Sequence, residues 1–161
     1  MSLRIEVDIA RQELRLFGAD GACIRRYPVS TALNGAGEQS GSGCTPRGEH
    51  VIRARIGAGM APNTVFSGRR PTGEHWSADL ARANPTRDWI LARILWLSGT
   101  RVGFNRLGDR DSMRRYIYIH GTPDNEPMGV AKSHGCVRMR TNEVIELFDL
   151  VEAGTPVSIL E

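Results

Sequence analysis

A chain of 161 residues is long enough to bury one hydrophobic core and short for two, so the sequence predicts a single domain over residues 1–161. Hydrophobic content of 40% with 18 glycines is typical of a globular protein with many turns, and no apolar run is long enough to span a membrane. The formal net charge is only +3, and no basic run with interleaved aromatic residues indicates nucleic-acid binding.

The N-terminal third predicts an antiparallel meander. Residues 3–9 alternate between apolar and charged side chains, as in a half-buried strand. Residues 12–17 and 23–30 continue as second and third strands on either side of a Gly-Ala-Asp-Gly turn. A loop rich in Gly, Ser and Asn at 34–43 then leads through Thr45-Pro46-Arg47-Gly48, a turn that opens the next strand.

The middle of the chain alternates between long connections and one apolar strand. Residues 57–88 lack periodicity and predict a functional loop or lid, in which His75 and Trp76 are candidates to line a substrate groove. Residues 89–97 are apolar on both faces and predict a central strand, with Ala92 on the same face as Ile94. A second polar loop follows at 98–112.

The C-terminal segment predicts a helix and a closing strand. Thr141 is expected to cap the helix, and Gly154 to close it. Its apolar stripe is made by Val144, Ile145, Leu147, Phe148 and Val151. Residues 155–160 then form the last strand. The expected fold is mainly β, an antiparallel sandwich or distorted barrel with one α-helix in the C-terminal region.

The cysteines show no metal-ligand spacing. Cys23 and Cys44 are expected to be free thiols, with a disulfide between them as the alternative. The chain begins at once with a strand pattern and has no recognisable secretion signal, so the sequence does not fix the compartment. Met1, Ser2 and Leu3 are possible cloning remnants.

The residues that can carry chemistry gather in the segment 116–140. Tyr118 and His120 fall on one face of a period-two run and Ile117 and Ile119 on the other, so the His120 side chain is expected at the end of a strand. A Gly-Thr-Pro-Asp-Asn turn follows. This is the composition of an active site at strand ends.

The chain returns as Ser133-His134-Gly135-Cys136-Val137-Arg138. A nucleophilic cysteine needs a nearby imidazole to form the thiolate and backbone N–H donors to bind the oxyanion. This segment can supply the thiol, the imidazole and the N–H donors. Cys136 alone would more often be a buried structural cysteine. Its combination with Gly135, His134 and His120 favours a nucleophile.

These residues resemble the L,D-transpeptidase catalytic domain, also called the YkuD-like domain. The resemblance rests on His120-Gly121-Thr122, the twelve positions from Gly121 to Lys132, and the Ser-His-Gly-Cys block that ends in Arg138. The Thr-Pro-x-Gly turn before the fourth strand is a further feature of the family. The resemblance covers essentially the whole chain, which implies a single catalytic domain.

The expected chemistry is thiol acyl transfer. Cys136 would be the nucleophile and His120 the general base, with the imidazole oriented by a carbonyl that the family resemblance places at Gly121. Asp124 is a distant second choice for that orienting role. The expected oxyanion donors are the N–H groups of Gly135 and Cys136.

The remaining residues of the motif are expected to support the site or bind substrate. His134 either favours the thiolate electrostatically or packs as a support, and Ser133 supports the same loop. Arg138 is expected to pair with a substrate carboxylate, and Tyr118 to contact substrate. No cofactor or metal is expected.

The resemblance also implies a substrate and a location. Cys136 would attack the third residue of a peptidoglycan stem tetrapeptide, release D-alanine and pass the acyl group to an amine, making a 3→3 cross-link. Carbapenems are the characteristic inhibitors of such enzymes. The substrate implies the periplasm or cell envelope, although the N-terminal sequence leaves the cytoplasm open.

Three alternatives remain at this point. A cysteine L,D-carboxypeptidase or endopeptidase would give the same thioester to water. A metal hydrolase would use His120, His134, Cys136 and His75, although their spacing is a weak ligand pattern. A non-catalytic cell-wall-binding domain would carry the motif without activity.

Overall fold

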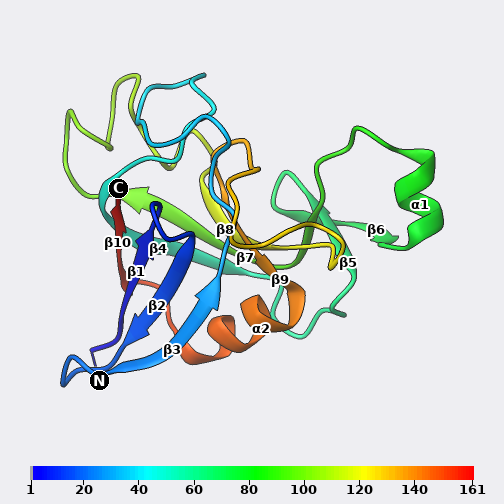
Figure 1. Cartoon of the computed structure of the whole chain (residues 1–161), viewed down its shortest axis with the longest axis horizontal. Helices are drawn as coiled ribbons and strands as arrows, with labels where there is room; N and C mark the ends of the chain where they lie inside the picture. Colours follow the sequence, from blue (N-terminus) through cyan, green and yellow to red (C-terminus); the bar gives the residue numbers. More distant parts are fainter. Residues whose placement is uncertain (1) are drawn as a thin grey trace.

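The computed structural model describes residues 2–161 and contains a curled sheet with two helices (Figure 1). Its ten strands are β1 Arg4–Asp8, β2 Glu13–Phe17, β3 Cys23–Pro28, β4 Gly48–Ile56, β5 Thr64–Ser67, β6 Arg70–His75, β7 Ile90–Gly99, β8 Tyr118–Thr122, β9 Val137–Arg140 and β10 Pro156–Leu160. The helices are α1 Ala78–Ala83 and α2 Thr141–Leu150. The prediction of a mainly β fold is confirmed.

The strand order is β3-β2-β1-β10-β4-β7-β5-β6, with β8 beside β7 and β9 beside β8. The N-terminal meander is antiparallel, as its alternating sequence predicts. Two pairs, β1 with β10 and β8 with β9, are parallel, so the sheet is mixed and not purely antiparallel. Parallel neighbours need a long crossover, and residues 123–136 provide it between β8 and β9.

The central strand is β7, which pairs with β4, β5 and β8. Its pairing with β8 shifts register between Leu91 and Ile94, where Ala92 has a left-handed φ of 71°. This bulge resets the alternation. Ala92 therefore lies in the buried cluster that contains Leu91, and its predicted position on the face of Ile94 is wrong.

Two apolar clusters occupy opposite faces of the sheet around β8. Ile119 of β8 and Val137 of β9 belong to the larger one, which α2 covers with Val144, Leu147 and Phe148. Helix α2 lies against β7, β8 and β9 (Figure 1). The smaller cluster holds Tyr118, next along β8, and therefore lies on the other face. Cys136 packs against this smaller cluster.

Two further local predictions were wrong. The stretch 57–88, expected to be a loop, contains the β5–β6 hairpin and the short helix α1, whose N-cap is Ser77. Periodicity missed the hairpin because β5 and β6 show almost no alternation between buried and exposed residues. It missed α1 because this helix buries none of its residues. Thr141 does not cap α2, since it is the first helical residue and its hydroxyl donates to the Thr122 carbonyl at 3.1 Å. That bond ties the start of α2 to the end of β8.

The remaining cysteines lie apart from the sheet's core. Cys23 is exposed and Cys44 is partly buried, and the structure holds both as free thiols. In residues 2–161, neither helix has the length and apolar character that crossing a membrane requires.

Candidate active site

His120 lies in β8 with only 1% of its surface exposed. Its Nδ1 is 2.7 Å from the carbonyl oxygen of Gly121. A carbonyl only accepts, so Nδ1 carries the proton and Nε2 of the neutral ring keeps its lone pair. Burial lowers the pKa of His120 below its ordinary value. The ring is therefore a neutral imidazole with a fixed tautomer and a basic Nε2.

Cys136 follows Gly135 and directly precedes β9. Its Sγ accepts from the Tyr118 N–H at 3.3 Å and donates to the Tyr116 carbonyl at 3.4 Å. Tyr116 has a left-handed φ of 56°, an uncommon conformation for an aromatic residue, and precedes the start of β8. Burial raises the pKa of the Cys136 thiol to about 11. The resting thiol is therefore protonated at neutral pH.

The parallel pairing of β8 and β9 brings these two residues to one face. Ile119 lies opposite Val137 and His120 opposite Arg138. Since Ile119 and Val137 point toward α2, the side chains of His120 and Cys136 lie on the other side of the sheet. No hydrogen bond joins Sγ of Cys136 to the imidazole in the part of the chain described here. Such bonds are often missing without substrate and form in the complex.

The turn before Cys136 requires glycine. Gly135 has φ 131°, and a Cβ there would lie 3.2 Å from the Cys44 carbonyl oxygen and 3.3 Å from Cδ1 of Ile117. The hydroxyl of Ser133 accepts from the Gly135 N–H at 3.2 Å and donates to the Cys136 carbonyl at 2.6 Å. Thr45 Oγ1 donates to the Gly135 carbonyl at 2.9 Å. The support expected from Ser133 thus takes the form of two specific bonds.

These bonds separate the two expected oxyanion donors. The N–H of Gly135 is already engaged by Ser133. The N–H of Cys136 makes no hydrogen bond to any residue from 2 to 161 and is free to donate.

Asp88 is the residue that sequence reasoning missed. Its carboxylate accepts from Arg138 Nη2 at 2.9 Å and contacts His134 Nδ1 at 3.2 Å. Burial alone would raise the pKa of Asp88, but its interactions with His120, Arg138 and His134 hold it below its ordinary value. The available signal was an acidic residue next to the apolar central strand, at the end of a connection already expected to be functional.

Arg138 and His134 both contact the Asp88 carboxylate. The Arg138 side chain is 8% exposed and lies between Asp88 and Glu126, whose Oε2 is 3.8 Å from Nη1. The guanidinium therefore already has two acidic partners. The His134 side chain is 76% exposed, so it lies at the rim of the site, and Asp124 is exposed on the β8–β9 crossover.

A hollow of about 400 Å³ is lined in part by Tyr116, whose carbonyl accepts from Sγ of Cys136. Its walls come from the 40–43 loop, the segment 114–117 and His134. Arg115 holds the loop in place through bonds to the carbonyls of Cys44 at 2.6 Å and Gly37 at 3.3 Å. Burial lowers the pKa of Arg115, but the side chain stays a cation because arginine titrates far above neutral pH.

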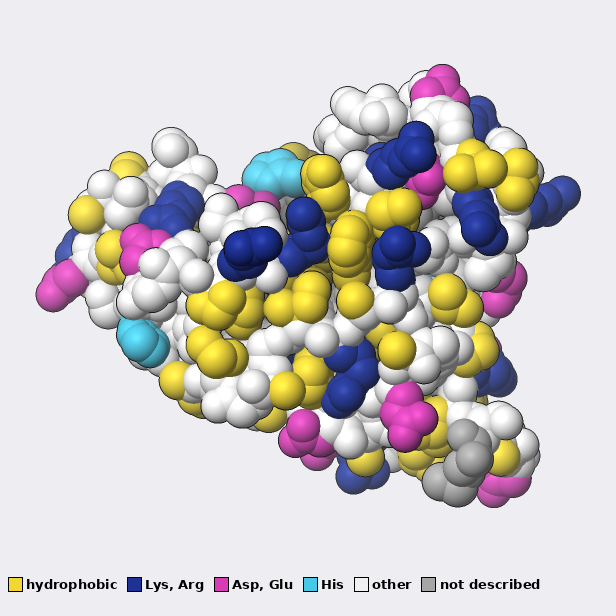
Figure 2. All heavy atoms as spheres, turned by 180° about the vertical axis from the view of Figure 1, so that it is seen from behind, with side chains coloured by type: hydrophobic (Ala, Val, Ile, Leu, Met, Phe, Trp, Pro, Cys, Tyr) yellow, Lys and Arg dark blue, Asp and Glu magenta, His cyan; other side chains and the backbone are white. Residues whose placement is uncertain are grey.

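The other wall of the site is aromatic. Tyr118 is buried and its hydroxyl accepts from Arg69 Nη1 at 3.0 Å. The Trp96 ring lies 6.3 Å from the rings of both Tyr116 and Tyr118. Figure 2 views the molecule from behind and shows apolar side chains gathered on this face, with basic side chains among them.

The four candidate metal ligands are not grouped in the described structure, namely His75, His120, His134 and Cys136. Across residues 2–161, no three His, Cys, Asp or Glu side chains are grouped to hold a metal ion. His75 is exposed at the end of β6, whereas His120 and Cys136 lie on β8 and before β9. Trp76 packs against the larger apolar cluster.

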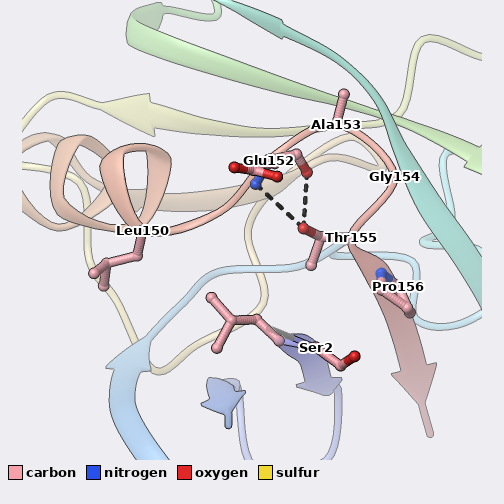
Figure 3. A pocket seen from close by; sticks show the side chains of 8 residues that line it. Ser2, Leu150, Glu152, Ala153, Gly154, Thr155 and Pro156 are labelled. Atoms are coloured by element: carbon pink, nitrogen blue, oxygen red, sulfur yellow. Dashed lines mark hydrogen bonds between the residues drawn. The ribbon is translucent and has the colours of Figure 1, made fainter. Parts of the chain in front are cut away.

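A larger pocket of about 510 Å³ lies elsewhere, beside the end of α2 and the start of β10 (Figure 3). Its lining residues are Ser2, Leu3, Leu150, Glu152, Ala153, Gly154, Thr155 and Pro156. The Thr155 hydroxyl is bonded within the turn to the Glu152 N–H and carbonyl (Figure 3). With no cysteine or histidine in its walls, this pocket offers no acyl-transfer chemistry.

Known proteins include relatives of this chain. The family model described as the L,D-transpeptidase catalytic domain, YkuD, matches residues 2–159. The chain belongs to this family. A protein of Bacillus licheniformis is 44% identical to this chain over 156 residues. Its provisional name is L,D-transpeptidase YkuD. The match covers 97% of this chain and 64% of that protein, so the chain spans less than two thirds of its relative.

Solved structures show the same fold. An L,D-transpeptidase from Mycobacterium smegmatis matches with a TM-score of 0.58 at 18% identity, over 99% of this chain and 59% of that one. L,D-transpeptidase 3 from Mycobacterium tuberculosis, solved with a faropenem-derived adduct, gives a TM-score of 0.60 at 15% identity, over 99% and 60% of the two chains. The L,D-transpeptidase catalytic domain fold is therefore the fold of this chain.

Proposed function

We propose that this chain is an L,D-transpeptidase that acts on peptidoglycan stem peptides through a thioester on Cys136. The observation that supports this most directly is the placement of Cys136 and His120 on one face of the β8–β9 pair, with Nδ1 of His120 bonded to Gly121. That bond leaves Nε2 as a base, as nucleophilic catalysis by a thiol requires. Membership of the family supports the choice of substrate.

The first half of the reaction is acylation. Sγ of Cys136 attacks the carbonyl of the third residue of a stem tetrapeptide, and the thiol proton passes to Nε2 of His120. The Cys136 N–H donates to the oxyanion that forms. The bond to the terminal D-alanine then breaks, and the imidazolium returns the proton to the leaving amine. The products are a thioester and free D-alanine.

The second half transfers the acyl group. A side-chain amine of a neighbouring stem attacks the thioester, a new amide forms as a 3→3 cross-link, and the thiol is regenerated. Neutral imidazole suits both halves, because it takes a proton from each nucleophile and gives it to each leaving group. Since the substrate is wall peptide, we place this activity at the cell envelope.

Asp88 and Arg138 act indirectly in this scheme, through their effect on His120. Their ion pair lies beside His120, and the negative charge of Asp88 favours the imidazolium form that acylation creates. Arg138 in turn holds the carboxylate in place. The Gly121 carbonyl, and not a carboxylate, orients the imidazole itself.

The test is intact mass after incubation with a carbapenem or with a stem tetrapeptide. Wild type should gain one adduct with the carbapenem and should release D-alanine from the tetrapeptide. Cys136→Ala should do neither. Cys23→Ala, which removes an exposed thiol, is the matched control and should behave as wild type. Dimers among the products support transpeptidation, tripeptide alone indicates carboxypeptidation, and an inert thiol in wild type contradicts catalysis.

A further inference from the structure

Arg69 lies at the turn of the β5–β6 hairpin and reaches over the aromatic wall of the site. Its guanidinium carbon is 4.8 Å from the centre of the Trp96 ring and 4.7 Å from that of Tyr116. Its Nη1 donates to the Tyr118 hydroxyl at 3.0 Å. Two rings and a hydroxyl therefore fix the position of one cation.

This cation stands close to the thiol. The two tyrosines that hold Arg69 are the residues that contact Sγ of Cys136, Tyr116 through its carbonyl and Tyr118 through its N–H. The guanidinium contacts the side chains of these two tyrosines, and the sulfur contacts their backbone. A substrate bonded to Sγ would lie next to the same two residues.

Arg69 is also unpaired. Among residues 2–161, no carboxylate lies within 4.0 Å of its guanidinium. Arg138 is already paired with Asp88, and Arg115 donates to two backbone carbonyls. A guanidinium has five N–H donors in a planar fork, and Arg69 uses one of them on Tyr118. The other donors are free for a ligand.

We propose that Arg69 determines specificity by binding the terminal carboxylate of the donor peptide, an inference that rests on the proposed function. That carboxylate belongs to the residue directly after the scissile carbonyl, and consecutive Cα atoms are about 3.8 Å apart. Arg69 is held by the residues whose backbone contacts Sγ, and it has free donors for that carboxylate. A planar fork also matches the geometry of a carboxylate better than an ammonium does.

Arg69 of the β5–β6 hairpin thus takes the carboxylate-binding role that the sequence predicts for Arg138. It also gives the leaving group its own binding site, so the enzyme would select peptides that end one residue beyond the attacked carbonyl. A peptide with a further residue or a neutral end would lose the ion pair. Selection of this kind depends on the charge at the peptide's C-terminus and not on its side chains.

The experiment compares a tetrapeptide with a free C-terminal carboxylate and the same peptide with a C-terminal amide. Wild type should favour the free acid in kcat/KM for C-terminal release, D-alanine from the acid and D-alaninamide from the amide. Arg69→Met should lose about 10- to 100-fold on the acid, the range for a charge-assisted bond, and little on the amide. Arg69→Lys should retain part of the preference.

Arg70→Met is the matched control, because Arg70 is the next residue, carries the same charge and is exposed. It should keep the wild-type ratio between acid and amide. Alkylation of Cys136 by iodoacetamide should be unchanged in Arg69→Met, which reports an intact thiol environment.

Two results would overturn the inference. An equal loss on acid and amide would show that Arg69 only supports the tyrosines, and no loss on either peptide would show that it does not touch the carboxylate. If wild type releases nothing from either peptide, the proposed function itself fails, and this inference fails with it.

Discussion

At the scale of single residues, the site differs from a serine-protease triad in how its base is held. The Gly121 carbonyl fixes the His120 tautomer, and the carboxylate of Asp88 bonds to Arg138 and His134 instead. A carbonyl carries only a partial charge, so it orients the ring without strongly raising its basicity. Asp88 supplies the full negative charge from a distance.

We expect Asp88→Asn to shift the acid limb of the acylation rate to lower pH. Asp88 raises the pKa of His120, so removing its charge makes the imidazolium less stable and leaves the base neutral at lower pH. The variant should also lose about 1–3 kcal/mol of unfolding free energy, because Arg138 is buried and loses a charged partner. The measurements are carbapenem acylation rates from pH 4 to 9 and urea unfolding.

Asp79→Asn is the control for this variant. Asp79 also pairs with an arginine, but the pair is exposed on α1 and contributes little. Its pH profile and stability should match wild type. An acid limb that stays in place in Asp88→Asn would show that the carboxylate has no electrostatic effect on His120.

At the scale of elements, the site depends on how closely β8 lies between β7 and α2. A Cβ added at Gly121 would be 2.6 Å from the Leu91 carbonyl oxygen and 3.2 Å from Cγ1 of Val144. Glycine is thus needed because backbone and helix leave no room for a side chain. The same residue supplies the carbonyl that orients His120.

We expect Gly121→Ala to destabilise the fold by about 1–3 kcal/mol, the usual cost of overpacking, and to slow acylation at least tenfold. The added methyl must push β8 away from β7 or α2, which displaces the imidazole. Gly18→Ala is the control, since the atom closest to its Cβ would be Oδ1 of the flexible Asp20 side chain at 3.2 Å. Wild-type acylation by Gly121→Ala would contradict the dependence of the base on this packing.

The elements also show what a sequence can predict. Alternation located β1 and β2, an apolar run located β7, and the motif named His120 and Cys136 as the catalytic pair. The common face of these two residues comes from the parallel pairing of β8 with β9, which the sequence does not show. Asp88 and Arg69 were not predicted, since they reach the site through the hairpin and the bulged start of β7. Such positions depend on tertiary pairing and leave no periodic signal.

At the scale of the whole molecule, the catalytic segment is connected to β4 through a buried histidine. His50 Nδ1 is 3.0 Å from the Gly48 carbonyl oxygen, and its Nε2 is 2.8 Å from the hydroxyl of Ser112. Ser112 closes the 98–112 loop, and its carbonyl accepts from the Ile117 N–H at 3.2 Å. A neutral imidazole fits both bonds, as donor to Gly48 and acceptor from Ser112.

This histidine makes the fold sensitive to acid. Burial lowers the pKa of His50 to about 4, whereas in the unfolded chain it titrates near 6.5. Between these values the unfolded state binds the proton and the folded state does not. The free energy of unfolding therefore falls as pH drops from about 6.5 to 4, by on the order of 3 kcal/mol from this residue. Buried His120 adds to the loss in the same direction.

We expect His50→Gln to flatten this part of the stability profile. The variant should be less stable than wild type at pH 7, because one buried bond is weakened, and the gap should narrow as pH falls toward 4.5. Urea unfolding at pH 7, 6, 5 and 4.5 measures how the free energy of unfolding of each protein changes with pH. The carboxylates that both proteins share contribute equally, so their effect cancels in the difference between the two. His75→Gln, at an exposed site, should keep the wild-type slope. Parallel slopes for wild type and His50→Gln would show that the buried imidazole does not cause the acid sensitivity, and that the link from β4 to the catalytic segment tolerates its protonation.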